Sequence, residues 1–163
     1  MVPTIRRARP ADARAIATLV NTAYEVERFF VEGDRTSATA VGALMGDGVF
    51  YVGIDDHPAL VAAVFVDVRG AVGSFGLLAV HPEARGQGWA RRLIEAAEAH
   101  ARDTGATEME IQVVNLRTEL FPLYERFGYT RRGMAPYVNR PVVQPVHFVL
   151  MRKTLRTMPS SQM

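Results

Sequence analysis

The chain has 163 residues, of which 48% are hydrophobic and 22% are charged, a balance that predicts a folded domain with a buried core. Its formal net charge of +2, with basic residues spread along the chain, argues against a nucleic-acid-binding protein. The chain contains no cysteine, which excludes disulfides, thiolate metal sites and cysteine nucleophiles.

Two further classes are disfavoured. No apolar run approaches the roughly 20 residues of a membrane-spanning helix, and Met1–Pro10 lacks the apolar region of a signal peptide. We therefore expect a cytoplasmic protein with no membrane partner. The histidines do not have the spacing of metal ligands, so we expect no metal site; they are His57, His81, His100 and His147.

The first half of the chain predicts a short extended segment, a helix and a hairpin. Thr4–Arg9 is extended, and Pro10–Ala23 carries apolar residues at helical spacing. Tyr24–Thr39 is expected to be irregular. Val49–Ile54 and Ala59–Val68 are rich in β-forming residues and are joined by a turn-rich segment, which predicts an antiparallel hairpin.

The second half begins with a strand over Val72–Val80 and a helix over Gly88–Thr104. The elements expected after these are a strand at Glu108–Val114, a short helix ending near Gly128, and strands at about Tyr129–Ala135 and Val146–Arg152. We predict one α+β domain over residues 1–156 with a mixed, mostly antiparallel sheet, and a disordered tail over residues 157–163.

The most informative segment is the junction between the third strand and the second helix. A tight loop with Gly86 and Gly88 leads into a helix N-terminus, where unpaired backbone N–H groups and the helix dipole favour an anion. Glycines let the backbone approach a phosphate closely, and Arg85 and Arg91 add positive charge. The junction therefore predicts a pyrophosphate site.

Two common nucleotide-binding loops do not fit this junction. A dinucleotide fingerprint would need glycine or alanine at position 91, which is Arg91, and no Gly-Lys-Ser/Thr sequence of a phosphate-binding loop is present. From the glycines alone, a simple strand-to-helix turn without a ligand remains an equal alternative.

The sequence Arg85-Gly86-Gln87-Gly88-Trp89-Ala90 resembles the Arg/Gln-x-x-Gly-x-Gly/Ala signature of the GNAT N-acetyltransferases. Downstream, Leu123–Tyr129 is similar to the tyrosine-bearing helix of that family and its Gly-Tyr exit. The resemblance covers roughly Thr4–Lys153. It implies the GNAT fold, a twisted sheet with helices on both faces, and acetyl-coenzyme A (acetyl-CoA) as acyl donor.

The resemblance also implies roles for individual residues. Tyr124 would be the general acid that protonates the departing thiolate. The backbone of Leu78 and Val80 would pair with the pantetheine arm as an added strand, and the backbone amides of residues 87–91 would hold the pyrophosphate. The implied cofactor-binding residues are Leu78, Ala79, Val80, Arg85, Gly86, Gln87, Gly88, Trp89, Ala90, Arg91 and Asn115. Without its resemblance to the family motif, Tyr124 would be interpreted as an amphipathic residue of the core.

The general base is not identified. Where some family members carry a glutamate, this sequence has Ser74, which could only position a water. The candidates for the base elsewhere are Glu25, Glu27, Glu110 and His147. The acceptor site corresponds to the family's variable region, Tyr24–Asp47. The candidate substrate-contacting residues are Glu25, Phe29, Phe30, Arg35 and His147, with Arg35 as the partner of a carboxylate and Glu32 or Asp34 of an ammonium. Phe29 and Phe30 are equally compatible with a hydrophobic staple.

Three functions remain open at this point. The first is an acetyl-CoA-dependent N-acetyltransferase in which the primary amine of a small molecule attacks the thioester directly. The second is a non-catalytic acyl-CoA binding or sensing module, and the third is a plain nucleotide binder. A homodimer through Val142–Val149 is also compatible with the sequence.

Overall fold

The computed structural model describes residues 3–156, so the expected tail at 157–163 lies outside the described residues. Within the described part, no helix combines the length and hydropathy of a membrane-spanning segment. The elements are β1 (Thr4–Arg7), η1 (Pro10–Asp12), α1 (Ala13–Ala23), η2 (Tyr24–Phe29), α2 (Ala38–Leu44), β2 (Val49–Ile54), β3 (Ala62–Arg69), β4 (Val72–Val80), η3 (Pro82–Ala84), α3 (Trp89–Asp103), β5 (Glu108–Val114), α4 (Leu120–Arg126), β6 (Thr130–Pro136) and β7 (His147–Thr154).

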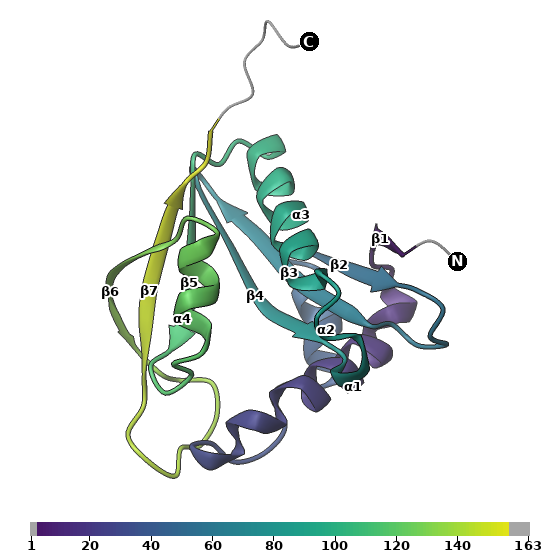
Figure 1. Ribbon diagram of the computed structural model, residues 1–163, viewed down its shortest axis with the longest axis horizontal. Coiled ribbons are helices and arrows are strands. Elements are labelled where there is room, and N and C mark those ends of the chain that lie inside the picture. Colours follow the sequence, from purple (N-terminus) through teal and green to yellow (C-terminus); the bar gives the residue numbers. More distant parts are fainter. Residues whose placement is uncertain (1–2, 157–163) are drawn as a thin grey trace, which may run out of the picture.

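A single seven-stranded sheet runs through the described residues in the order β1-β2-β3-β4-β5-β7-β6 (Figure 1). β4 and β5 pair in parallel, whereas every other neighbouring pair is antiparallel. The expected mixed, mostly antiparallel sheet is confirmed. The parallel pair needs a long crossover, which α3 supplies.

Helices cover both faces of this sheet (Figure 1). α1 buries Ile16 and Val20 at helical spacing against one face, together with α2. α3 buries Leu93 and Ala97 against the other face, where α4 contributes Phe121 and Tyr124. Two apolar layers therefore hold the sheet between them, as the resemblance implied.

The sequence did not predict α2, and it started β3 three residues too early. α2 is seven residues long and buries only Val41, so it has almost no periodic signal. The Ser37 side chain caps its N-terminus by accepting a hydrogen bond from the Ala40 amide at 3.1 Å. Pro122 lies in the first turn of α4, where no backbone donor is needed.

β4 and β5 are paired over only three residues before they diverge. Their register runs from Val72 to Ser74 on β4, after which the two strands separate (Figure 1). On the other side of β4, the register with β3 shifts at Phe65, and Leu77 has a left-handed φ of 52°. This β-bulge bends β4 away from β5 and leaves the backbone of the strand beyond it without a neighbour on the β5 side.

The β6–β7 loop closes against the segment that follows α1. The Glu32 amide donates to the Pro141 carbonyl at 3.0 Å, and the Val143 amide donates to the Phe30 carbonyl at 2.9 Å. Residues 24–35 and 137–146 therefore form one wall below the divergence of β4 and β5.

Candidate active site

The glycine loop has the backbone that an anion site requires. Gly86 and Gly88 have φ values of 78° and 82°, a region that side chains rarely adopt, and open space surrounds the position of a Cβ at both. Gly88 caps α3, whose first intrahelical hydrogen bond from the amide of Arg92 reaches the Gly88 carbonyl. The amides before it, from Trp89 to Arg91, have no acceptor within the helix.

A hollow lies directly at this loop. Arg85 and Arg91 line it from the loop and the start of α3, and Leu123 and Arg126 line it from α4. The Trp89 side chain is buried and packs against Gly53, where a Cβ would approach it to 2.5 Å. Trp89 thus packs the start of α3 against β2, and the same residue lines the hollow.

This hollow continues into the divergence of the strands. Val80, Arg85, Ala90 and Leu123 line both it and a second hollow beneath α4. The second hollow shares Leu78 and Tyr124 with a third, which lies between the diverging ends of β4 and β5. The three hollows form one groove from the glycine loop to the wall made by residues 24–35 and 137–146.

Tyr124 stands at the middle of the groove. Its side chain is 7% exposed and lines two of the three hollows. Burial raises the pKa of its phenol, nearby Tyr24 raises it further, and Arg117 opposes both effects. Among the described residues, no protein group hydrogen-bonds to the Tyr124 hydroxyl. The phenol is therefore protonated at neutral pH and free to donate into the groove.

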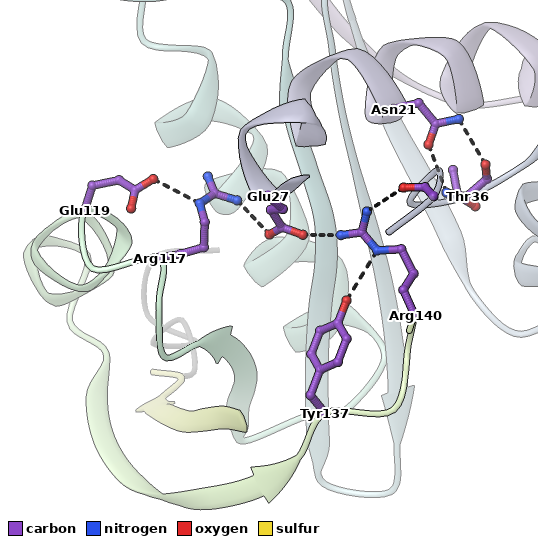
Figure 2. Close-up of polar contacts among 8 residues, drawn as sticks. Asn21, Glu27, Thr36, Arg117, Glu119, Tyr137 and Arg140 are labelled. Atoms are coloured by element: carbon purple, nitrogen blue, oxygen red, sulfur yellow. Dashed lines mark hydrogen bonds and ion pairs between the residues drawn. The ribbon is translucent and has the colours of Figure 1, made fainter. Parts of the chain in front are cut away.

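An ion-pair cluster closes the far end. The Glu27 carboxylate is 3% exposed and accepts from Arg117 at 2.8 Å on one oxygen and from Arg140 on the other (Figure 2). Arg117 also pairs with Glu119 at 2.9 Å, and Arg140 donates to the Tyr137 hydroxyl at 3.3 Å. Both oxygens of Glu27 are occupied, so it joins η2 to the β5–α4 and β6–β7 loops instead of acting as a free base.

Tyr24 and Arg35 complete this end. Tyr24 follows α1 and lines the two inner hollows, and the Arg35 guanidinium lies 5.7 Å from the centre of the Tyr24 ring. Burial raises the pKa of Tyr24, whereas the positive charge of Arg35 lowers it. Three phenols, two guanidiniums and the buried Glu27 carboxylate thus line this hollow; the phenols belong to Tyr24, Tyr124 and Tyr137, and the guanidiniums to Arg35 and Arg117.

A family model described as an acetyltransferase (GNAT) domain matches residues 46–131, more than half of the chain. The chain belongs to the GNAT acetyltransferase family. This confirms the family, the fold and the class of enzyme expected from the sequence, with acetyl-CoA as the acyl donor.

The GNAT chain is similar to two proteins of named activity. It is 28% identical to an IAA acetyltransferase of Azospirillum brasilense over 134 residues, which are 82% of this chain and 74% of that protein. It is 36% identical to the mycothiol acetyltransferase of Geodermatophilus obscurus over 64 residues, 39% of this chain. That match spans only 21% of the mycothiol enzyme.

Solved structures share the fold over almost the whole chain. An N-acetyltransferase from Staphylococcus aureus Mu50 superposes with a TM-score of 0.78 at 15% identity, covering 96% of this chain and all of that one. YncA of Salmonella typhimurium, solved with its cofactor acetyl-CoA, has a TM-score of 0.75 at 20% identity and 98% coverage of both chains. At these identities the likeness shows the GNAT fold.

The structure brings most of the residues predicted for the GNAT cofactor to the groove. The side chains or backbone of Leu78, Val80, Arg85, Gly86, Gly88, Trp89, Ala90 and Arg91 line it, together with Tyr124. Gln87 lies in the loop between the two glycines. The Ala79 side chain is buried in the α1 layer, so only its backbone faces the strand edge.

Other predicted residues lie elsewhere. Asn115 and His147 line a separate hollow beside β6, where the Asn115 side-chain oxygen accepts from the His147 amide at 2.9 Å. Phe30 is fully buried in a small core cluster with Phe148. Glu25 and Phe29 are exposed outside the groove. Of the candidate acceptor residues, the structure places Arg35 in the groove.

The base candidate Glu110 and the water-positioning candidate Ser74 are also outside the groove. Glu110 pairs with Arg152 at 2.6 Å on a different surface, and Ser74 lies where β4 is still paired with β5. Sequence reasoning missed Tyr24, Arg117, Arg140 and Tyr137. Their only sequence signal is polar or aromatic character in loops, because the contacts among them join segments about a hundred residues apart.

Proposed function

We propose that this GNAT chain transfers the acetyl group of acetyl-CoA to a primary amine of a small molecule by direct attack. The continuous groove from the glycine loop to Tyr124 carries the proposal, because it is open at an anion-binding helix end and leads between two strands with free backbone edges. A cytoplasmic location and a homodimer stay predictions.

The donor would occupy the first half of the groove. The amides from Gln87 to Arg91 would hold the pyrophosphate, with charge from Arg85 and Arg91. Beyond the Leu77 bulge, the backbone between Leu78 and Val80 would hydrogen-bond the pantetheine arm as an added strand. The thioester would then lie near Tyr124 at the divergence of β4 and β5.

Tyr124 would act when the carbon–sulfur bond breaks. The amine nitrogen bonds to the carbonyl carbon, and the tetrahedral intermediate expels the sulfur, which takes the Tyr124 proton and leaves as the thiol. The phenolate then recovers a proton from the nitrogen, directly or through water. Because its raised pKa keeps Tyr124 protonated at neutral pH, a donor is always present for the developing thiolate.

The amine must lose a proton before it attacks, since free amines have pKa values near ~10.4. Glu27 is the one carboxylate buried at the far end among the described residues, and both its oxygens are held by guanidiniums. We infer that the cationic surroundings and burial lower the pKa of the bound ammonium, so that water can remove its proton without a dedicated base.

The first test is calorimetric titration with acetyl-CoA, coenzyme A and ATP. Gly88→Glu places a carboxylate at the loop and should abolish coenzyme A binding. Gly70→Glu is the matched control, because Gly70 also has a positive φ, of 61°, and open space around it, but lies in the β3–β4 turn away from the groove. It should bind coenzyme A like the wild type.

Three outcomes would contradict the proposal. If coenzyme A does not bind, or if ATP binds equally well, the groove is not a specific site for the donor. Coenzyme A binding without transfer to any amine in a broad panel would favour the non-catalytic binding module instead.

A further inference from the structure

Arg35 is the one guanidinium at the far end of the groove that has no carboxylate partner among the described residues. It is half-buried and lines the hollow between β4 and β5, where its guanidinium lies over the face of the Tyr24 ring. Its neighbour Thr36 is fixed to α1 by two hydrogen bonds with the Asn21 side chain, of 2.9 and 3.0 Å (Figure 2). The backbone that carries Arg35 is thus anchored.

The other charges at this end are already matched. Glu27 takes both Arg117 and Arg140, and Glu119, which is 57% exposed, takes Arg117 from the other side. The carboxylate next to Arg35 in sequence, Asp34, is 68% exposed and lies 3.6 Å from Arg28. Three guanidiniums therefore face two carboxylates, and the unmatched positive charge belongs to Arg35.

This balance disfavours cationic acceptors. A polyamine or any acceptor with a second ammonium would bring positive charge to a site whose buried carboxylate is fully occupied. A carboxylate on the acceptor would instead complete the ion pair that Arg35 lacks, in the planar two-bond geometry that a guanidinium offers.

We propose that the acceptor is an amine that also carries a carboxylate, an amino acid or a similar aminocarboxylate, and that Arg35 binds this carboxylate. The inference rests on the proposed acetyl transfer and adds the substrate class. With the carboxylate at Arg35 beside Tyr24, the amino group faces the part of the hollow that Tyr24 shares with Tyr124. Arg35 is then a specificity-determining residue.

The test measures thiol release from acetyl-CoA with matched acceptors. Free amino acids are compared with the amides and the decarboxylated amines of the same compounds, and with spermidine. We expect kcat/KM for the best amino acids to exceed that of the corresponding amides and amines by about 10-fold or more, as for a charge-assisted hydrogen-bonded pair.

Variants separate Arg35 from general charge effects. Arg35→Gln should lower kcat/KM for the amino acid by about 10- to 100-fold and leave that for the amide nearly unchanged. Arg35→Lys should retain part of the preference. Arg28→Gln removes an exposed arginine of the same region and should change neither value. Coenzyme A affinity, measured by calorimetry, should be the same in all of them.

Two results would overturn the inference alone: wild-type transfer to amides or cationic amines that equals or exceeds transfer to the acids, or an equal loss for both in Arg35→Gln. No transfer to any acceptor, with coenzyme A still bound, would overturn the proposed function together with this inference. No coenzyme A binding would already reject the donor site.

Discussion

Tyr124 and Tyr129 lie five residues apart with ring centres separated by 6.3 Å, yet their hydroxyl groups have opposite environments. The Tyr129 hydroxyl donates to buried Glu98 at 2.7 Å, and Lys153 holds the same carboxylate at 2.9 Å. Among the described residues, the Tyr124 hydroxyl has no such partner and faces the groove. We therefore expect Tyr124, on α4, to act in the chemistry and Tyr129, just after α4, to act in stability.

Tyr124→Phe should lower kcat by about 10²-fold or more, because the phenol is the proposed proton donor to the thiolate. The ring and its packing remain, so the melting temperature and the affinity for coenzyme A should stay close to wild type. Tyr51→Phe is the control, since that hydroxyl contacts His100 outside the groove. Unchanged turnover in Tyr124→Phe would refute the assignment.

Tyr129→Phe should have the opposite effect. Removing its hydroxyl takes a hydrogen bond from Glu98, which is 5% exposed, and should lower the free energy of unfolding by about 1–3 kcal/mol. Denaturant unfolding measures this change, and coenzyme A titration should show unaltered affinity. If Tyr129→Phe lost turnover without losing stability, Tyr129 and not Tyr124 would be the better candidate for the proton donor.

The pH dependence follows from the direction of the Tyr124 shift. The protonated phenol is the active form, and burial raises its pKa above the ordinary value of 10.0. With a confirmed acceptor, kcat/KM should rise with pH as the amine loses its proton and should show no alkaline decline up to about pH 10. A decline between pH 7 and 9 would contradict a tyrosine acid.

Glu27→Gln should destabilise the wall at the far end of the groove. The substitution leaves Arg117 and Arg140 as buried like charges without their shared carboxylate, a change that costs about 3 kcal/mol or more in comparable pairs. Thermal unfolding and proteolysis of the 137–146 loop would both report it. Glu25→Gln, which changes an exposed neighbour on η2, should leave both unchanged.

Much of the fold is readable because the apolar residues are periodic. The helical spacing of Leu93, Ile94 and Ala97 and the β-rich runs of the hairpin place α3, β2 and most of β3 within a few residues of their observed bounds. α2 could not be read in this way, since its seven residues bury one side chain and depend on a cap at Ser37.

The glycine-loop end of the groove could also be predicted from the sequence, because its residues are close together in the chain. The glycines, the helix N-terminus and Arg85 lie within a few consecutive residues, so their spacing alone predicts an anion site. The divergence of β4 and β5 was not predictable, because it depends on a bulge at Leu77, a residue type that does not favour a left-handed φ.

The composition of the far end of the groove, where we propose that the acceptor binds, depends on tertiary structure. The sequence made Arg35 one of five candidates for contact with the acceptor, and only the tertiary structure shows that Arg35 lines the groove and the others do not. The other four are Glu25, Phe29, Phe30 and His147. The sequence by itself determined the family, most of the sheet and the glycine loop that we propose binds the donor, because their signals come from neighbouring residues. Which charges face the groove depends on Glu27 meeting Arg140 across 113 residues, a contact that no local pattern specifies.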